Sequence, residues 1–351
     1  MKGYINLSVL RKLVQVTSFV FLVYGGTLVG FYMADKLSIA LPALSCAYDQ
    51  KAADICTLVP FQHEMAHRVG TTLAAGGSLW MGLMPVLITL ATFLVIFVFL
   101  NKAFCGWVCP LGFFQEMMSL IGQKLGLRRI ESLAAGSVDR IRPVKWVMLS
   151  VLVFGLPLLS GLGFVSHDFV GSYCNICPSR ILTTLATGDT SQLYVDSSNT
   201  TLMVFSVIAD FLFGGIMALA LTMRQPFCRI CPLLALHAVF RKLGLVRLVK
   251  NAKPRCNKCG LCAKACPMDI REIQTEMEKK NVVFADCTLC GRCVEFCPDK
   301  DVLQLKYAVF PVFRADPAYF KRRNKAQQRW EKANLFAWWR GRKRAMQAQE
   351  G

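Results

Sequence analysis

The C-terminal part of the chain contains CNKCGLCAKACP at residues 256–267 and CTLCGRCVEFCP at residues 287–298. In each stretch three cysteines are separated by two residues, and a fourth follows after three more, directly before proline. Three thiolates with this spacing can converge on three corners of an iron–sulfur cube, while the fourth points away to a second cube. The spacing therefore predicts two [4Fe-4S] clusters and disfavours a pair of zinc sites.

The same spacing predicts which cysteines share a cluster. Each set combines three cysteines of one stretch with the last cysteine of the other. Cluster 1 is expected to bind Cys256, Cys259, Cys262 and Cys297, and cluster 2 is expected to bind Cys287, Cys290, Cys293 and Cys266. Gly260 and Gly291 would let the backbone turn close to the inorganic sulfurs. We expect residues 251–305 to form a small α+β domain of the bacterial 2[4Fe-4S] ferredoxin type.

The rest of the chain has the composition of a membrane protein. Of its 351 residues, 54% are hydrophobic and 18% are charged, which excludes a disordered chain. The mean hydropathy is +0.42. Four apolar runs, at about 13–33, 79–100, 144–164 and 202–223, approach the ~20 residues that a helix needs to cross the hydrocarbon. We therefore expect an α-helical membrane domain with four spans over residues 1–235.

The charged residues between these runs predict the orientation. Segments 101–143 and 224–250 contain twelve Lys and Arg against three acids, whereas segments 34–78 and 165–200 contain four against seven. Basic loops are retained in the cytoplasm, so both termini and the ferredoxin domain should be cytoplasmic and the two acidic segments outside. We expect a multi-pass protein of the bacterial inner membrane, with the lipid bilayer as a partner and no nucleic acid.

The membrane part contains a short internal repeat. KLGLRR at residues 124–129 recurs as KLGLVR at residues 242–247, an offset of 118, and the same offset separates Cys56 from Cys174. These matches predict two tandem repeats of two helices each, related by an axis along the membrane normal. Chance similarity between apolar segments is the alternative.

Four cysteines are predicted at the inner face of the membrane. Cys105 and Cys109 follow the second apolar run, and Cys228 and Cys231 follow the fourth. Two repeats that contribute two thiolates each would complete a third [4Fe-4S] site, while structural thiols or a zinc site are the alternatives. A disulfide is disfavoured in a reducing compartment.

The other cysteines of the membrane part are predicted at the outer face. They are Cys46, Cys56, Cys174 and Cys177. By the logic of the repeat they could bind a fourth cluster. They could equally form disulfides, including a redox-active pair of Cys174 and Cys177, and the sequence leaves both possibilities open.

The segment Cys105-Gly-Trp-Val-Cys-Pro-Leu-Gly-Phe-Phe-Gln-Glu116 resembles the signature of the membrane polyferredoxins of the NapH, MauN and NosR group. The resemblance covers roughly residues 10–305. It implies four or more spans, cysteine–proline motifs at the inner face and a cytoplasmic double ferredoxin. The chain departs from the pattern because its second inner motif is Cys-x2-Cys-Pro. It also lacks the outer flavin-binding domain of NosR-type proteins and the C-terminal β-domain of CcoG-type proteins, so the compact NapH-like form matches best.

Several other residues carry a chemical expectation. Asp210 lies near the middle of the fourth run, where a carboxylate is costly, so it is either a proton acceptor for quinol chemistry or an interhelical hydrogen-bonding residue. The sequence His63-Glu-Met-Ala-His67 matches a zinc-protease pattern, but a quinone contact or an interfacial helix is favoured. His167 could donate a hydrogen bond to a quinol or face water, and His237 is expected at the interface. No His lies within a run, which disfavours a membrane haem, and no nucleotide-binding motif is present.

Two segments flank the ferredoxin domain. Residues 236–250 are predicted to form an amphipathic linker helix. Residues 306–351 contain twelve Lys and Arg, three acids and nine aromatic residues, including Trp330, Trp338 and Trp339. This composition is typical of a helix on an anionic membrane surface or of a solvated basic tail.

These features together predict a membrane-bound iron–sulfur electron-transfer protein. The resemblance implies a relay between the quinone pool and a periplasmic or cytoplasmic redox partner, as the electron-transfer component of a quinol dehydrogenase. The alternative is a redox-sensing or metalloenzyme maturation factor of the CcoG or NosR type. A third possibility is an anchor subunit for a catalytic partner. The sequence does not name the partner, the quinone or the direction of electron flow.

Overall fold

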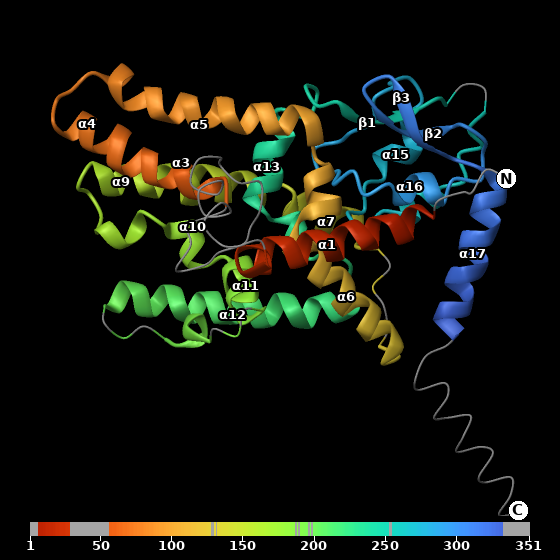
Figure 1. Cartoon of the computed structure of the whole chain (residues 1–351), viewed down its shortest axis with the longest axis horizontal. Coiled ribbons are helices and arrows are strands. Elements are labelled where there is room, and N and C mark those ends of the chain that lie inside the picture. Colours follow the sequence, from red (N-terminus) through yellow and green to blue (C-terminus); the bar gives the residue numbers. More distant parts are fainter. Residues whose placement is uncertain are drawn as a thin grey trace, which may run out of the picture.

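The computed structural model describes residues 6–28, 56–127, 130, 132–186, 188, 190–195, 197, 199–252 and 255–332. Residues 7–28 and 56–239 form an all-helical region, here called the helical domain. Residues 246–315 form a small mixed region, the C-terminal domain, which packs against one end of the helical domain (Figure 1). We call that end the docked end and the opposite end the far end.

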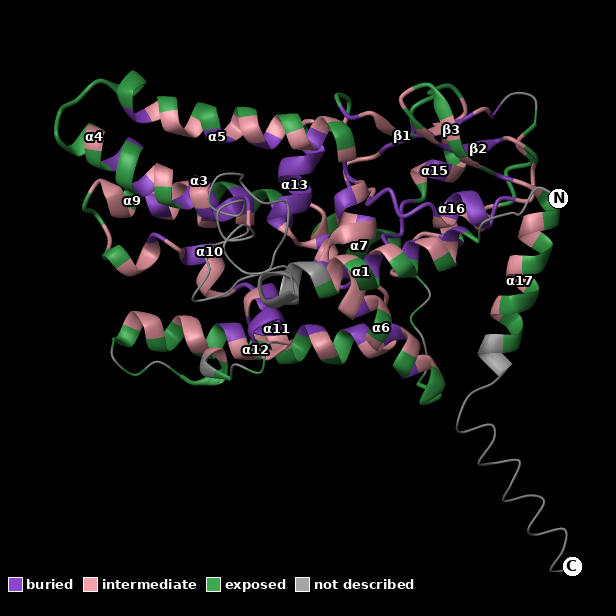
Figure 2. Cartoon of the chain, in the orientation of Figure 1, coloured by how far each residue is buried: buried purple, intermediate pink, exposed green. Residues whose placement is uncertain are grey.

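Among the described residues, three helical stretches of the helical domain are long and apolar enough to cross a membrane. They are α5 (Leu79–Leu100), the continuous stretch Ala135–Gly161, and α12 (Thr200–Thr222). The second stretch consists of α7 (Ala135–Ile141), α8 (Val144–Val147), η3 (Met148–Gly155) and α9 (Leu156–Gly161). All three run between the far end and the docked end (Figure 1). Large apolar side chains such as Met81 and Phe211 are 73% and 84% exposed, as expected for a surface that faces lipid (Figure 2).

The first of the four predicted spans is not among these three. Helix α1 (Leu7–Leu28) packs against α6 and η2, and its first half carries Arg11 and Lys12. Arg11 is buried and pairs with Glu116. The predicted run extended to about residue 33, and its last part lies outside the described residues.

The segment before α5, predicted as part of an outer loop, runs alongside that helix. It forms one continuous helix of α3 (Leu58–Glu64), η1 (Met65–Gly70) and α4 (Thr71–Ala74). The Thr89 hydroxyl, halfway along α5, donates a hydrogen bond to Glu64 (2.6 Å), and Gly82 near the start of α5 lies against Arg68 and Val69. The helix is therefore antiparallel to α5 and begins in the docked half of the domain. Because this helix contains several polar residues, a hydropathy profile does not identify it as a buried helix.

The second predicted outer loop also turns back into the domain. It contains four short helices: η4 (His167–Phe169), α10 (Ser172–Asn175), α11 (Pro178–Ala186) and η5 (Ser191–Leu193). Tyr173 and Cys177 are buried and belong to the main hydrophobic core. This core also contains Phe93, Phe97 and Phe104. Both loops thus supply buried residues to the centre of the bundle.

Helices at the docked end contain or follow the cysteine–proline motifs. They are η2 (Phe104–Val108), α6 (Pro110–Lys124), η6 (Phe227–Arg229) and α13 (Pro232–Val239). Proline stands at the first position of both α6 and α13, where its fixed φ suits a helix start and its missing N–H costs nothing. Each motif therefore places its last cysteine immediately before a helix.

The C-terminal domain is built on a three-stranded antiparallel sheet in the order β1-β2-β3. The strands are β1 (Val246–Lys250), β2 (Leu303–Tyr307) and β3 (Phe310–Arg314), with Leu248 opposite Leu305 and Leu305 opposite Phe313. Three short helices complete the domain: α14 (Leu261–Ala265), α15 (Glu272–Thr275) and α16 (Arg292–Glu295). Helix α17 (Pro317–Lys332) follows the sheet.

Two predicted boundaries differ from this arrangement. The predicted amphipathic helix over 236–250 is wrong in its second half, because α13 ends at Val239 and Val246–Lys250 is the first strand of the sheet. Alternating burial along the segment reflects strand pairing rather than a helix on a membrane. The sheet also extends the domain past residue 305 into the predicted tail. Trp338 and Trp339 lie outside the described residues.

Candidate metal centres

Left-handed backbone conformations curl the two cysteine-rich loops of the C-terminal domain. Gly260 (φ +77°) and Gly291 (φ +75°) precede α14 and α16, and glycine adopts this conformation without steric cost. Lys258 and Leu289, two residues earlier, also have positive φ. The loops therefore turn tightly enough for successive cysteines to face one cavity.

Two cysteine-lined cavities lie in the C-terminal domain. The first, of about 320 Å³, is site 1. The second, of about 430 Å³, is site 2. The cysteines in the wall of site 1 are Cys256, Cys259, Cys262 and Cys297, and those in the wall of site 2 are Cys266, Cys287, Cys290 and Cys293. The structure thus brings together the same two sets of four that the spacing predicts, with Cys266 and Cys297 exchanged between the loops.

A third cavity, site 3, lies in the helical domain at its docked end. It measures about 450 Å³. Its wall contains all four cysteines of the predicted inner set, Cys105, Cys109, Cys228 and Cys231. The first two come from η2 and the start of α6, and the other two from η6 and the start of α13.

The donor set of each cavity suits a cubane cluster better than a single ion. No three His, Cys, Asp or Glu side chains among the described residues could hold one metal ion. A [4Fe-4S] cluster requires one cysteine for each of four irons, so its ligands stand around a cavity. Burial raises the pKa of Cys287 to about 11. Iron binding must therefore displace protons from these thiols.

Sites 2 and 3 share a wall. Thr288 lines both cavities. Gly106, in the loop between Cys105 and Cys109, packs against the same segment, and a Cβ on it would lie 2.4 Å from the carbonyl oxygen of Thr288. Trp107 Nε1 donates a hydrogen bond to the carbonyl oxygen of Leu289 (3.0 Å). The two cysteine loops are therefore in backbone contact.

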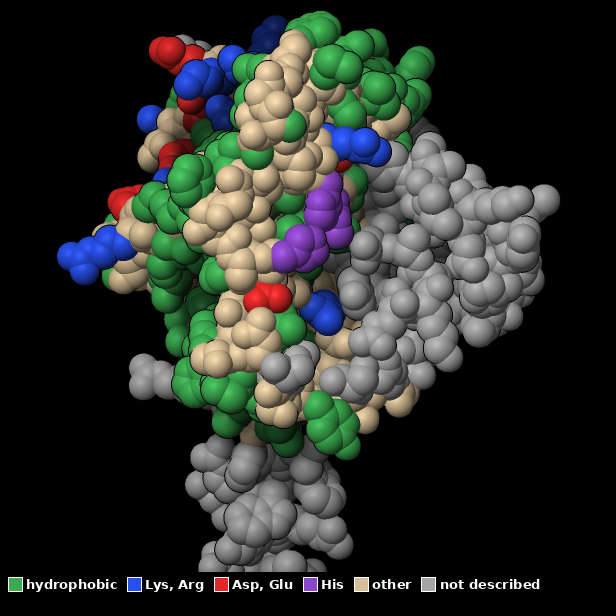
Figure 3. All heavy atoms as spheres, turned by 90° about the vertical axis from the view of Figure 1, so that its left-hand side faces the viewer, with side chains coloured by type: hydrophobic (Ala, Val, Ile, Leu, Met, Phe, Trp, Pro, Cys, Tyr) green, Lys and Arg blue, Asp and Glu red, His purple; other side chains and the backbone are tan. Residues whose placement is uncertain are grey.

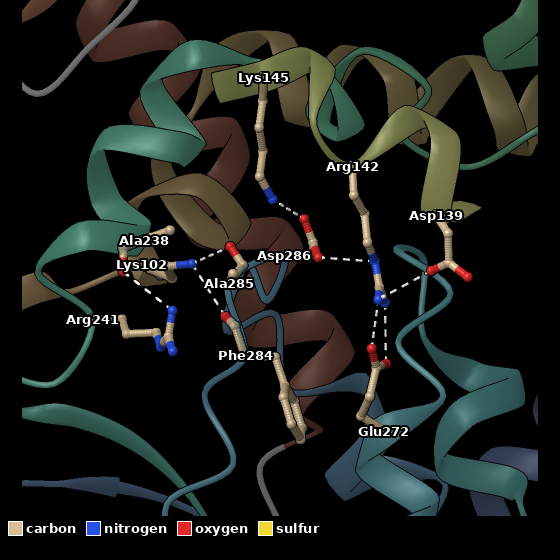
Figure 4. A network of polar contacts seen from close by, with 10 residues as sticks. All are labelled: Lys102, Asp139, Arg142, Lys145, Ala238, Arg241, Glu272, Phe284, Ala285 and Asp286. Atoms are coloured by element: carbon tan, nitrogen blue, oxygen red, sulfur yellow. Dashed lines mark hydrogen bonds and ion pairs between the residues drawn. The ribbon is translucent and has the colours of Figure 1, made fainter. Parts of the chain in front are cut away.

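Buried cations of the helical domain hold the segment that leads into site 2 (Figure 4). The Lys102 ammonium donates hydrogen bonds to the carbonyl oxygens of Phe284 (3.2 Å) and Ala285. Asp286, directly before Cys287, pairs with Lys145 and with Arg142. Lys102 and Lys145 are both at most 1% exposed. Burial lowers the pKa of Lys102 to about 8.

Further ion pairs fix the C-terminal domain at other points of the contact. Arg229, next to Cys228, pairs with Asp269 (2.8 Å) and donates to the carbonyl oxygen of Pro267 (2.8 Å). Arg142 also pairs with Glu272. The basic residues of segments 101–143 and 224–250 thus contact acids of the C-terminal domain, although the sequence suggested only a role in membrane topology.

Three of the cysteines predicted at the outer face, Cys56, Cys174 and Cys177, belong to the main hydrophobic core or pack against it instead. Cys177 is buried and lines site 3, and it lies within electrostatic range of Cys56. Cys174 Sγ accepts a hydrogen bond from Gln62 Nε2 (3.1 Å). Because both predicted loops turn back into the domain, these thiols reach its centre. Cys46 lies outside the described residues.

Two carboxylates lie at mid-depth along the long helices. Asp210 is on α12, and its buried Oδ1 has no hydrogen-bond partner among the described residues. Glu64 faces Thr89 of α5, and its buried Oε2 likewise has no such partner. Neither belongs to the walls of sites 1 to 3. The sequence analysis considered Glu64 only as part of His63-Glu-Met-Ala-His67, because the segment was predicted to be an outer loop.

The histidines fall into two places. His63, His67 and His167 form a row near the far end, with ring centroids 5.8 Å and 5.2 Å apart in that order, and histidines are exposed on that face (Figure 3). His237 was expected at the interface, but it is 1% exposed. Its Nδ1 lies 3.4 Å from Cys105 Sγ, and burial lowers its pKa to about 3. His237 is buried because it lies on the side of α13 that faces the core.

Comparison with protein families finds iron–sulfur domains in both parts of the chain. One family model, described as a 4Fe-4S binding domain, matches residues 82–128 and again residues 205–251. Another, described as a 4Fe-4S dicluster domain, matches residues 248–298. No solved structure matches the chain.

Three similar proteins illustrate the relatives. YccM of Escherichia coli (strain K12), whose name assigns it provisionally to electron transport, is 30% identical over 60% of this chain and 53% of its own length. The ferredoxin-type protein NapH of Haemophilus influenzae is 24% identical over 57% of this chain and 61% of its own length. The regulatory protein NosR of Pseudomonas aeruginosa is 26% identical over 62% of this chain and 27% of its own length. The chain thus spans less than two thirds of each of these three relatives.

Proposed function

We propose that this chain, which belongs to the membrane 4Fe-4S polyferredoxins of the NapH and NosR group, relays electrons between the quinone pool and a partner redox protein. It is a membrane iron–sulfur electron-transport protein. The proposal concerns the route of the electrons and the substrates at its two ends. The observation that carries it is the continuous line of cysteine-walled sites 3, 2 and 1.

The residues of the chain provide the conditions for transfer along this line. Four cysteines in each site would hold a [4Fe-4S] cluster, and such a cluster accepts and passes on single electrons. Thr288 separates sites 2 and 3, and the cysteine exchange between loops joins sites 1 and 2. An apolar group formed by Leu234, Met268 and Ile270 packs against cysteines of both sites 2 and 3 and limits water there.

The buried cations at the contact between the helical and C-terminal domains support electron transfer by fixing the position of site 2. Lys102 lies within electrostatic range of both Cys105 and Cys287. Together with Lys145 and Arg142 it holds the segment before Cys287 in one position. A fixed contact keeps the spacing of sites 2 and 3 constant, so the C-terminal domain need not move during transfer. Positive charge next to both sites also favours their reduced forms.

The proposed orientation places the docked end in the cytoplasm of a bacterial cell. It rests on the excess of Lys and Arg in segments 101–143 and 224–250, which join the long helices at that end. An alkaline phosphatase fused after Gly351 should then be inactive, whereas one fused at Ser197 should be active. The reverse pattern would place the C-terminal domain outside.

Iron counting tests the three sites. After anaerobic purification the wild-type chain should hold at least twelve irons, four for each site. The double variant Cys109→Ser, Cys231→Ser should lose about four irons and keep the EPR signals of the C-terminal domain. A quinol should then no longer reduce sites 1 and 2, although dithionite still does. Unchanged iron in this variant would overturn the assignment of site 3.

A second function is supported by the match to a protein named as regulatory. NosR is 26% identical to this chain over 220 residues, so a redox-sensing or maturation role is the alternative. The relay and the sensor differ in how many electrons each protein molecule passes on. A relay should pass electrons from excess quinol to an added ferredoxin-reactive acceptor repeatedly, whereas a sensor should stop after one reduction of its clusters.

A further inference from the structure

We infer that Cys56, Cys174 and Cys177 are three ligands of a fourth iron–sulfur cluster, in a site that is the inverted structural counterpart of site 3. Among the described residues this site has three cysteines where site 3 has four, so its fourth iron takes a ligand from outside this set. The inference extends the proposed electron relay, and therefore rests on it. The sequence alone left these thiols equally compatible with disulfides, because it placed them in outer loops. The structure provides two independent reasons to choose the cluster: a repeated framework and a shared location.

The framework of site 3 has a buried glutamine that joins its two cysteine segments. Gln115 is 0% exposed and stands in α6, four residues after Leu111 and six after Cys109. Its Nε2 donates to the carbonyl oxygen of Leu111 (3.2 Å). Its Oε1 accepts a hydrogen bond from the backbone N–H of Phe227 (3.0 Å), the residue directly before Cys228.

The same arrangement recurs around Cys56. Gln62 is also 0% exposed and stands four residues into its helix, after Cys56-Thr-Leu. Its Nε2 lies 3.1 Å from the carbonyl oxygen of Leu58, and its Oε1 accepts from the backbone N–H of Tyr173 (3.1 Å). Tyr173 stands directly before Cys174, as Phe227 stands before Cys228.

Three of the four cysteines of site 3 have a counterpart in the second framework, and Cys105 has none among the described residues. Cys56 precedes α3 by two residues as Cys109 precedes Leu111, and Cys174-x2-Cys177-Pro repeats the spacing of Cys228-x2-Cys231-Pro. The helix after Cys177 (α11) begins with Pro178, as α13 begins with Pro232. A chance arrangement of three cysteines would not reproduce the spacing, the proline and the glutamine bridge together.

The two frameworks point in opposite directions. The helix that follows Cys56 runs from the centre of the domain toward the far end, whereas α6, which follows Cys109, runs toward the docked end (Figure 1). Inverted repeats of this kind are related by an axis in the membrane plane. This relation is in addition to the tandem repeat that the sequence predicts.

The location suits electron transfer to site 3. Cys177 lines the cavity of site 3 and lies within electrostatic range of Cys231 as well as Cys56. A cluster bound by the three thiols would therefore adjoin site 3 and take one electron from it or give one electron to it. It would extend the line of centres toward the far half of a hydrocarbon layer that is ~30 Å thick.

The test compares two matched double variants of the full chain, purified without oxygen. Cys174→Ser, Cys177→Ser removes two proposed ligands, and Cys228→Ser, Cys231→Ser removes their counterparts in site 3. Each should lose about four irons and four sulfides from a wild-type total of about sixteen. Dithionite-reduced EPR of sites 1 and 2 should remain in both variants, which shows that they fold.

Three results would overturn the inference. The first is a wild-type total of about twelve irons, with four lost only from the Cys228 and Cys231 variant; the three-site relay would then stand without the fourth cluster. The second is a disulfide between Cys174 and Cys177, detected by mass spectrometry after alkylation of the unreduced chain. The third is a wild-type total of about eight irons, which would remove site 3 and with it the proposed relay.

Discussion

The two halves of the molecule build cysteine sites in different ways. The C-terminal domain takes eight cysteines from two loops within residues 256–297, and local spacing determines which four belong together. The helical domain collects the cysteines of site 3 from two segments more than a hundred residues apart, and only the packing of its helices brings them together. Local sites are therefore readable from a sequence, whereas assembled sites depend on the fold.

The largest expected difference between the two domains is in their stability after iron is removed. The C-terminal domain has little regular structure besides its three strands, so its fold depends on the clusters in the way that small metal domains do. The helical domain has long apolar helices that are stable in lipid without metal. Anaerobic treatment with a strong iron chelator should abolish amide protection over residues 255–300 and preserve it in α5 and α12, as read by hydrogen exchange. Equal loss in both domains would contradict this difference.

The contact between the halves should be sensitive to one methyl group. In Gly106→Ala the new Cβ would lie 2.4 Å from the carbonyl oxygen of Thr288, so the loops of sites 2 and 3 must separate. We expect electron transfer between these sites to slow several-fold, because the rate of electron tunnelling falls steeply as the two centres move apart. Stopped-flow reduction by quinol measures it. Gly214→Ala, where a Cβ meets no atom within 4 Å, is the matched control and should keep the wild-type rate.

The charge of Lys102 should affect site 2 more than site 1. Lys102→Met removes a fully buried cation near Cys287, so the reduction potential of site 2 should fall, by on the order of 50 mV for a Coulomb energy of about 1 kcal/mol. EPR redox titration measures the shift. Lys279→Met, at a side chain that is 76% exposed, should leave both potentials unchanged. A fall of the same size at site 1 would indicate a general change in the domain.

This effect should also depend on pH. Burial lowers the pKa of Lys102 to about 8. Below that pKa the lysine is charged and raises the potential of site 2. As the pH rises through it, the lysine becomes neutral, so the difference between wild type and Lys102→Met should shrink above pH 8.

The smallest expected effects are on proton transfer from quinol, which only the helical domain would carry out. Asp210→Asn and Glu64→Gln each keep the size and hydrogen-bonding capacity of a mid-depth carboxylate but remove its titration. If either residue accepts a proton from quinol, its variant should reduce its clusters a few-fold more slowly with quinol. Dithionite should still act at the wild-type rate, because that route bypasses the proton. Wild-type quinol kinetics would leave the residue as a hydrogen-bonding group only.

The sequence predicted the sites of the C-terminal domain more completely than those of the helical domain. The spacing of the quartets predicted both cysteine sets of the C-terminal domain, and the short repeat predicted the set of site 3. The depth of Cys56 and Cys177 could not be predicted, because the helix that carries Glu64, His67 and Arg68 is too polar to register as buried in a hydropathy profile. The buried ion pairs of Lys145 and Arg229 could not be predicted either. A basic segment is explained as well by membrane topology as by pairing with acids of another domain. The strand Val246–Lys250 was missed because its partner lies more than fifty residues later.

The polar helix from Leu58 to Ala74 has a consequence for how the protein is made. A segment with a glutamate, two histidines and an arginine does not partition into lipid on its own, so neighbouring helices must receive it. One of its contacts is with Gly161, where a Cβ would lie 2.1 Å from the carbonyl oxygen of Ala66. Gly161 is synthesised almost ninety residues after that segment. The helix must therefore wait in the translocation machinery or at the membrane surface until α9 emerges, which makes the two glycines of this contact, Gly70 and Gly161, determinants of biogenesis rather than of catalysis.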